Sequence, residues 1–267
     1  MGMDSATNTE ELQKANINNL TSLWKVMGLK PQTDSIMTDL NISLTWPNRC
    51  WVDVDSGTSL LQFSKVLPHC STNLLPIWDL NLNETCDADS VINEDIKNRE
   101  ILLLENNFIC LFQQTAMILA LSSAHQKTDE TFSGGRHNIQ AIHSHEDIEI
   151  WTDIASQSFG YQVDITTIRH IANNENITLL MHQYDGQAAG VAMLYKTDEI
   201  IGVHQVGVLN EYRGKGIARI LMQHVINLSK EQQARYITLQ ASVIGEPLYR
   251  RLGFSEQFKI RSYMRST

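Results

Sequence analysis

The chain has 267 residues, which is enough for one large domain or for two domains of about 130 residues each. Its composition, 42% hydrophobic and 19% charged, is that of an ordinary globular protein and excludes collagen-like and disordered classes. The formal net charge of -9 argues against non-specific binding to nucleic acid.

The basic side chains are concentrated near the C-terminal end. Residues 201–267 contain ten Lys or Arg and four Asp or Glu, whereas the rest of the chain is acidic. A local basic zone on an acidic protein suits a small polyanionic ligand.

The cysteines give no metal or disulfide pattern. Cys50, Cys70, Cys86 and Cys110 include no CxxC pair, so neither a zinc site nor a disulfide framework can be read from them. No charged-then-apolar leader opens the chain, and no window approaches about 18 apolar residues. We therefore expect a cytoplasmic protein with reduced thiols, no bound metal and no association with membranes.

Taken in chain order, the first 130 residues predict alternating helices and strands. Helical spacing of apolar residues and β-branched or aromatic runs distinguish the two kinds of element. The expected elements are a helix over 11–28, strands within 35–46 and 49–55, a helix over 58–67, a strand within 73–82, a helix over 90–107, and strands from 108–121. The first part of the chain is thus an α/β domain.

The polar segment 125–137, which includes Gly134-Gly135, is the best candidate for a domain boundary. We place the division near residue 130, which gives domains 1–130 and 131–267. The second domain predicts a strand over 138–144, helices over 146–160 and 164–174, three strands between 177 and 208, a helix from Gly216 to about 233, a strand over 236–242, a short helix over 245–253, and a strand over 257–265.

One weak internal similarity links the two parts. In each, a helix is followed by Asn-Phe or Gly-Phe and a strand with a second Phe four residues later, so Phe108 and Phe112 would correspond to Phe254 and Phe258. A structural repeat and chance both explain this pattern.

The most informative stretch is VGVLNEYRGKGIARILMQHV, residues 206–225. Gly214 and Gly216 stand just before an expected amphipathic helix, where backbone N–H groups are unshielded at the positive end of the helix dipole. Arg213 and Lys215 add positive charge there. The segment predicts a phosphate site.

Two common nucleotide motifs fit this segment poorly. A P-loop needs four residues between its glycines and a Lys directly after the second one, and here one residue separates the glycines and Ile217 follows. A Rossmann fingerprint needs a third glycine where Arg219 stands.

The spacing Arg213-x-x-Gly216-x-Ala218 resembles the Q/R-x-x-G-x-G/A pattern of the GNAT superfamily of N-acetyltransferases. Downstream, LYRRLGF at residues 248–254 resembles the second hallmark of that superfamily. The resemblance covers roughly 138–265 and implies an α/β fold with a splayed, mixed central sheet flanked by helices. The preceding α/β domain is either a degenerate GNAT-like copy, as in tandem-GNAT proteins, or a family-specific domain.

The resemblance implies that acetyl-CoA enters between the strand ending at Val208 and the strand over 236–242. The backbone from Val206 through Gly207 to Val208 would pair with the pantetheine arm. The N–H groups from Gly214 to Ala218, including those of Lys215, Gly216 and Ile217, would hold the pyrophosphate. Ser242 stands where the superfamily often has Asn, which puts hydrogen bonding on that side of the cofactor in doubt.

Two side chains are candidates for proton transfer. Tyr249 matches the tyrosine of the second hallmark and would protonate the CoA sulfur, although simple packing beside the cofactor is the alternative. His204 lies four residues before Val208, on the same strand face, and would act as the base. A structural role is the alternative for His204.

These observations predict an N-acetyltransferase that moves the acetyl group of acetyl-CoA directly to a primary amine of a small or cationic acceptor. The alternatives are an acyl-CoA-binding or sensing protein without turnover and, in third place, a binding module built on the basic C-terminal region. Monomer and homodimer both remain open.

Overall fold

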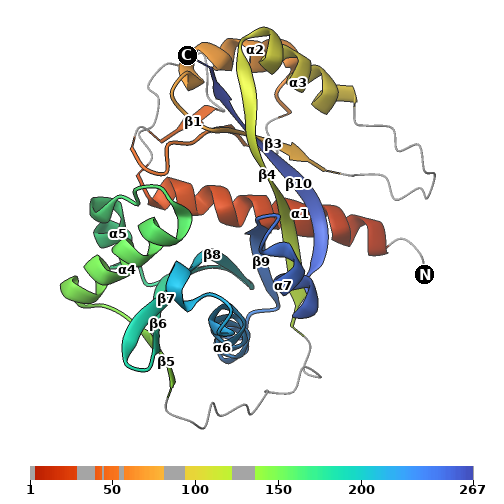
Figure 1. The fold of residues 1–267 in the computed structure, drawn as a ribbon. Helices are drawn as coiled ribbons and strands as arrows, with labels where there is room; N and C mark the ends of the chain where they lie inside the picture. The colour runs from red at the N-terminus through yellow and green to blue at the C-terminus, as the bar shows by residue number, and fades with distance from the viewer. Residues whose placement is uncertain are drawn as a thin grey trace. The chain divides into compact units, whose positions relative to one another are not determined.

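The structure is a computed structural model that describes residues 4–28, 40–43, 45–53, 57–80, 94–121 and 136–266 (Figure 1). It divides into two compact units, each made of separate chain segments. Unit 1 comprises Met1–Met117, Ala241–Glu246 and Glu256–Thr267, and unit 2 comprises Ile118–Gln240 and Pro247–Ser255. The boundary predicted near residue 130 lies outside the described residues and stays a prediction.

Unit 1 combines helices with short strands. Its elements are α1 (Asp4–Val26), the paired strands β1 (Leu40–Ile42) and β2 (Cys50–Val52), α2 (Leu60–Val66), the 3-10 helix η1 (Leu67–Cys70), β3 (Leu75–Asp79), α3 (Glu94–Glu105), the first part of β4 (Phe108–Ala120) and most of β10 (Ser255–Arg265). The strand order here is β3-β10-β4, and β10 pairs antiparallel with β3.

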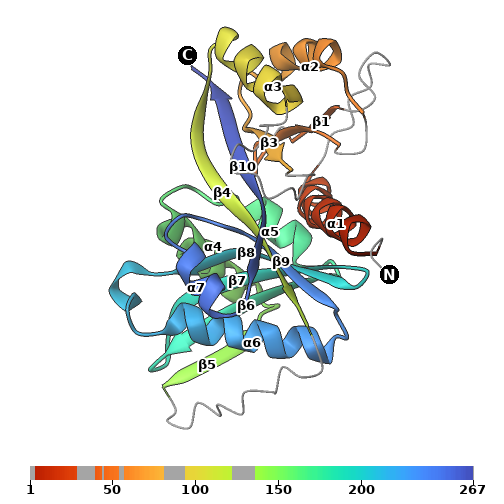
Figure 2. The same cartoon turned by 90° about the vertical axis from the view of Figure 1, so that its right-hand side faces the viewer.

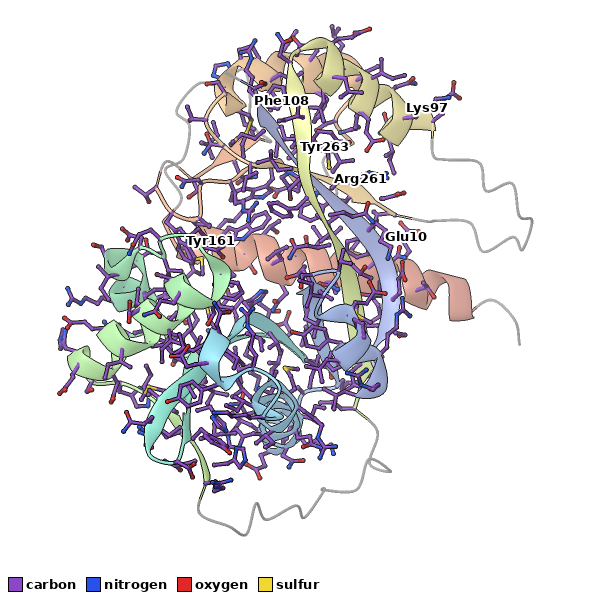
Figure 3. The ribbon with its side chains drawn as sticks, in the orientation of Figure 1. Glu10, Lys97, Phe108, Tyr161, Arg261 and Tyr263 are labelled. Atoms are coloured by element: carbon purple, nitrogen blue, oxygen red, sulfur yellow. A yellow bond between two sulfur atoms is a disulfide. The ribbon has the colours of Figure 1, made fainter. Side chains whose placement is uncertain are left out.

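The last strand of the chain is tied to its neighbours in unit 1 by charged side chains. Arg261 of β10 donates from Nη2 to Asp79 Oδ2 at 2.8 Å and contacts Glu100 Oε1 at 2.6 Å. Tyr263, two residues on, donates its hydroxyl to the same Glu100 oxygen at 2.6 Å; both β10 residues are labelled in Figure 3. These bonds fix β10 against β3 and α3.

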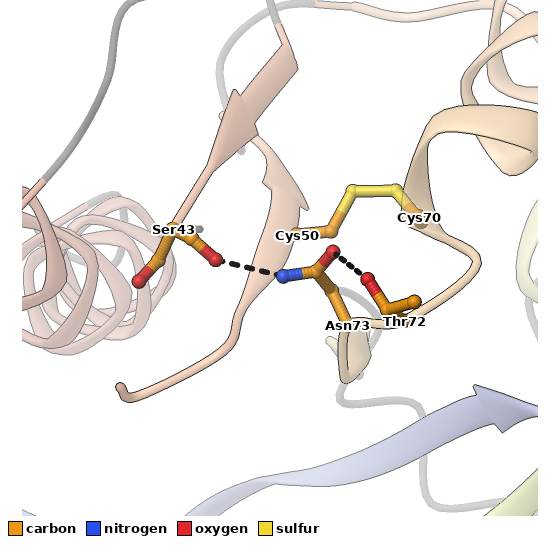
Figure 4. Close-up of a disulfide and its surroundings, with 5 residues drawn as sticks. All are labelled: Ser43, Cys50, Cys70, Thr72 and Asn73. Carbon is orange, nitrogen blue, oxygen red and sulfur yellow. Dashed lines mark hydrogen bonds between the residues drawn. A yellow bond between two sulfur atoms is a disulfide. The ribbon is translucent and has the colours of Figure 1, made fainter. Parts of the chain in front are cut away.

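A disulfide corrects one expectation from the sequence. Cys50 of β2 and Cys70 at the end of η1 are fully buried and joined by a disulfide, with their Cα atoms 5.7 Å apart (Figure 4). Nearby, Asn73 Nδ2 donates to the carbonyl of Ser43 at 2.7 Å. The expectation of reduced thiols is wrong for this pair, because folding brings together two cysteines that are 20 residues apart. The third described cysteine, Cys110, is free.

Unit 2 is built on one mixed sheet. Its strands are the end of β4, β5 (His137–Ala141), β6 (Ile177–Tyr184), β7 (Gln187–Thr197), β8 (Ile200–Val208) and β9 (Tyr236–Ala241), and they follow the order β4-β9-β8-β7-β6-β5. β5 to β8 pair antiparallel, whereas β8 and β9 are parallel. The helices are α4 (His145–Phe159), α5 (Ile165–Ile171), α6 (Ile217–Glu231) and most of α7 (Glu246–Arg251).

Two glycines identify which helix covers each face at the end of β8. A Cβ added at Gly207 would lie 2.8 Å from the Cβ of Ser158 in α4. One added at Gly190 would lie 3.1 Å from a side-chain methyl of Ile217, the first residue of α6. Because Gly190 and Gly207 point to opposite sides of the sheet, α4 covers one face and α6 the other (Figure 2).

The element types expected from the sequence are confirmed throughout the described residues. The two segments of the weak similarity share a turn: α3 and α7 are each followed by a strand after one residue with positive φ, Asn107 at 63° and Gly253 at 91°. Phe108 and Phe254 are both buried, but Phe112 is exposed where Phe258 is buried. A shared helix-to-strand turn explains the similarity without a whole-domain repeat, which stays a prediction.

Among the described helices, none combines the length and the apolar character that crossing a membrane requires.

Candidate functional site

The ladder between β8 and β9 ends before β8 does. Ile200 to Val203 pair in parallel with Tyr236 to Leu239, and β8 then continues to Val208. Beyond Val203 the ladder with β9 does not continue, although His204 bonds to Gln240 of β9 through its side chain. This confirms the predicted divergence of the two strands and leaves backbone hydrogen-bonding groups along one side of β8.

A β-bulge interrupts β8 just beyond the end of its ladder with β9. His204 pairs with Met193, and Gly207 pairs with Val191. Gln205 and Val206 of β8 therefore lie opposite a single residue of β7, Ala192. Gln205 has a φ of 52°, which absorbs the extra residue. The bulge bends the strand at the point where its pairing with β9 has stopped.

The bulge also reverses the face on which His204 lies. The sequence expectation put His204 on the same face as Val208, but the register puts it with Gly207, on the side covered by α4. That expectation is wrong because the extra residue shifts the alternation of side chains by one. His204 is buried, which lowers its pKa to about 4, and a hydrogen bond with Gln240 opposes part of that shift.

The loop between β8 and α6 has the open backbone that the sequence predicted. Gly214 and Gly216 have φ values of 78° and 80°, and a Cβ built on either would meet no atom within 4 Å. Gly216 is the N-cap of α6 and provides no side chain to accept from the first N–H groups of the helix. Those N–H groups form the positive end of the helix dipole, and this arrangement is suited to binding a phosphate group.

The two cations of the loop are held differently. Arg213 turns back, donating from Nε to the carbonyl of Val208 at 3.2 Å and from Nη2 to that of Ser158 at 3.1 Å. It thus braces the end of β8 against α4. Lys215 places its ammonium over two tyrosine rings, 4.6 Å from the centre of Tyr212 and 5.0 Å from that of Tyr184.

The structure adds an aromatic pair that sequence reasoning missed. Phe159 at the end of α4 and Tyr161 just after it are exposed and stacked, with ring centres 5.7 Å apart. The hydroxyl of Tyr161, labelled in Figure 3, lies 3.5 Å from the amide oxygen of Gln205 in the bulge. Phe159 also lies near Gly207. Two exposed aromatics flanking Gly160 in a helix-terminating turn were the only signal in the sequence.

Tyr249 lies in α7 and belongs to the same unit as the loop. Its side chain is buried, and burial raises its pKa to about 12. The ring packs edge-on against Phe254 of the same hallmark, with centres 5.9 Å apart. The phenol therefore keeps its proton at neutral pH, as a proton donor must.

Ser242 belongs to the segment assigned to unit 1. Its hydroxyl accepts the N–H of Gly245 at 3.1 Å, and its carbonyl accepts from Gly245 and Glu246. In the structure Ser242 stabilises the turn before α7, and its predicted contact with the cofactor stays a prediction.

Comparison with known proteins identifies the fold of this region. Residues 139–254 match the model of the family described as Acetyltransferase (GNAT) family. The chain contains a GNAT acetyltransferase domain. The matched residues include the loop, α6 and the Tyr249 hallmark, so the resemblance seen in the sequence is confirmed.

Two relatives are similar to parts of this domain. A streptothricin acetyltransferase of Streptomyces lavendulae is 32% identical over 76 residues, which are 27% of this chain and 40% of that protein. A Bacillus subtilis (strain 168) protein, provisionally described as a ribosomal protein bS18 alanine N-acetyltransferase, is 26% identical over 112 residues, which are 40% of this chain and 74% of that protein. The chain thus spans less than half of the first relative.

Solved structures extend the likeness of fold to nearly the whole chain. A GCN5-related N-acetyltransferase from Kribbella flavida has a TM-score of 0.64 at 13% identity, covering 96% of this chain and 95% of its own. Another, from Sphaerobacter thermophilus, has a TM-score of 0.59 at 14% identity, covering 84% and 75%. The predicted fold class, a mixed α/β sheet flanked by helices, is confirmed.

The buried imidazole of His204 leads to a prediction about pH. Its pKa is lower in the folded chain than in the unfolded one, so the unfolded state binds more protons below about pH 6.5. As far as this group is concerned, the free energy of unfolding is highest above that pH. It decreases as the pH falls towards 4, by up to about 1.4 kcal/mol per pH unit for one group. We expect His204→Gln to reduce the slope of unfolding free energy against pH between 6.5 and 4, measured by urea denaturation.

His170→Gln, which replaces an exposed imidazole, is the matched control and should leave the slope unchanged. An unchanged slope in His204→Gln, or an NMR titration of His204 near pH 6.5, would contradict the burial argument.

Proposed function

We propose that the protein is an N-acetyltransferase that transfers the acetyl group of acetyl-CoA directly to a primary amine. The observation that carries the proposal is the end of the β8–β9 ladder beside two open, positive-φ glycines at the N-terminus of α6. This combination offers unpaired strand backbone for an amide-containing arm and N–H groups for a pyrophosphate. The GNAT family match over the same residues supports it.

In this proposal the N–H groups from Gly214 to Ala218 bind the pyrophosphate, and the backbone from Val206 to Val208 pairs with pantetheine. The carbonyl of Val208 already accepts from Arg213, but an amide oxygen can accept two hydrogen bonds. Arg213 then acts mainly by fixing the end of β8. Lys215 adds a positive ammonium group beside the loop.

The chemistry needs two proton transfers. The amine nitrogen attacks the thioester carbonyl carbon, the C–S bond breaks, and the sulfur receives a proton as the amine nitrogen loses one. Tyr249 holds its proton at neutral pH and is assigned as the donor to sulfur. His204 is unprotonated at neutral pH and is assigned as the acceptor of the amine proton. Exchange with water then returns a proton to Tyr249 and removes one from His204, so the number of protons gained and lost is equal.

The acceptor is proposed to be a small or cationic amine. The exposed rings of Phe159 and Tyr161 lie against the bulge of β8, and aromatic faces attract cations and apolar groups alike. The acidic character of residues outside the C-terminal region favours a positive acceptor. The relatives' names point the same way, since one acts on streptothricin and the other on an alanine of a ribosomal protein.

A first experiment tests the phosphate cradle. Gly216→Glu places a carboxylate where the pyrophosphate would bind, and Gly216→Gln has the same shape and backbone strain without the charge. We expect isothermal titration calorimetry to show acetyl-CoA affinity at least about 100-fold lower for Glu than for the unaltered protein, with Gln in between. Equal affinity for the two variants would contradict a phosphate at this position.

A second experiment tests the proton-transfer assignments. Tyr249→Phe and His204→Gln should each lower kcat by about 10- to 1,000-fold in a thiol-release assay across a panel of amines, while the Kd for acetyl-CoA changes less than about threefold. Tyr212→Phe, another tyrosine of the same unit, is the control. Normal kcat in Tyr249→Phe would refute the donor role. Acetyl-CoA binding with no thiol release on any amine would instead favour a sensing protein.

A further inference from the structure

Gln240 of β9 lies beside His204 of β8 at the point where the two strands begin to separate. Val203 and Leu239 form the last pair of the parallel ladder, so His204 and Gln240 come next in order, with their side chains on the same face of the sheet. Backbone pairing stops there, but a side-chain hydrogen bond still joins the two residues. Both residues belong to unit 2. The bond therefore connects the strands at the inner end of their divergence.

The neighbours that surround His204 on this face are uncharged. Met193 of β7 pairs with His204 and is fully buried, and Thr238 precedes Gln240 on the same face of β9. On this side of the sheet, α4 places Ser158 over the end of β8. The causes that set the pKa of His204 are burial and the bond with Gln240, neither of which is a charge. Gln240 thus contacts the imidazole through an uncharged amide.

The amide oxygen of Gln240 is the acceptor in this bond. The bond raises the pKa of His204, as an acceptor does because it stabilises the protonated ring. An amide N–H donated to the ring would stabilise the neutral form and lower the pKa instead. A neutral imidazole has one N–H and one free lone pair. Since the N–H points to Gln240, the lone pair is on the other ring nitrogen.

We propose that Gln240 is a positioning residue that fixes the tautomer of His204 and directs its lone pair towards the amine. This inference rests on the acetyltransferase proposal. There, pantetheine runs inward along Val206 to Val208, so the thioester would follow near His204, where the ladder with β9 ends. The exposed rings of Phe159 and Tyr161 lie beside the same stretch of β8. The lone pair accepts the amine proton, and the imidazolium keeps its other N–H on Gln240.

An uncharged partner suits a buried base. A carboxylate at position 240 would stabilise the imidazolium and hold the ring protonated to a higher pH. A protonated ring cannot accept a proton from the amine. The amide of Gln240 supplies orientation and leaves His204 neutral at pH 7.

Nitrogen-15 NMR of the imidazole of His204 tests the positioning in the full-length protein without substrates. We expect one tautomer near pH 7 in the unaltered protein and loss of that preference in Gln240→Met, whose side chain is also unbranched but has no amide. Gln240→Glu should raise the pKa of His204 by about 1 to 3 pH units, because it adds a negative charge.

Thr238→Val is the matched control on the same face of β9. It removes a buried hydroxyl that has no hydrogen-bond partner in the described part of the chain, and it should change neither the tautomer nor the pKa of His204. Thermal unfolding identifies any variant that fails to fold, and Gln240→Glu keeps an acceptor of the same shape. An unchanged tautomer in Gln240→Met together with an unchanged pKa in Gln240→Glu would overturn the proposal.

Kinetics test the consequence for turnover. Gln240→Met should lower kcat about 10- to 100-fold in the thiol-release assay, while the Kd for acetyl-CoA changes less than about threefold. In Gln240→Glu, the acid limb of kcat/KM against pH should move upward by as much as the pKa of His204, so activity returns at high pH. Normal kcat in folded Gln240→Met would overturn the role in turnover.

The outcomes separate this inference from the proposal on which it rests. Absence of thiol release by the unaltered protein, or normal kcat in His204→Gln, would count against the proposed function, and the NMR result would still decide whether Gln240 orients the imidazole. A low kcat in His204→Gln with a normal kcat in Gln240→Met would overturn the role of Gln240 alone.

Discussion

The early end of the parallel ladder between β8 and β9 is the constraint on which the site in unit 2 depends. A parallel pair that continued to Val208 would satisfy its own N–H and C=O groups and leave nothing for a ligand. The ladder stops at Val203, and the bulge at Gln205 bends the strand directly afterwards. The open glycines and the helix N-terminus then follow at the end of the same strand, so in the proposed function a single chain segment would supply both backbone pairing and phosphate binding.

The helices on the two faces hold that segment in place. α4 packs so closely on Gly207 that a Cβ there would overlap Ser158, and α6 packs on Gly190 from the opposite side. Trp151 of α4 donates its indole N–H to the carbonyls of Leu180 and Ala192, which fixes α4 to the centre of the sheet. Arg213 adds the last connection, from the loop to the end of α4. The end of β8 is therefore held by a helix on each face and by β7 along one edge, while its ladder with β9 stops at Val203.

The two units solve different packing problems. Unit 2 has long strands whose apolar residues alternate or run continuously between two helical layers, the pattern that sequence periodicity detects well. Unit 1 has short strands and helices, and it depends on a disulfide and on the ties from Arg261 and Tyr263 to Glu100.

The sequence by itself determined the type and order of the elements and the position of the proposed phosphate loop. Glycine at positions 214 and 216 is a local requirement, because φ values near 80° and close approach of a ligand both exclude larger side chains. The periodicity of α6 and the Tyr249 hallmark are local in the same sense. Only the tertiary structure decided the face of His204, the pairing of Cys50 with Cys70, and the meeting of Tyr161 with Gln205. Each of these depends on register or on contacts between distant segments, and a one-residue bulge or a chain crossover changes them without leaving a signal in the local sequence.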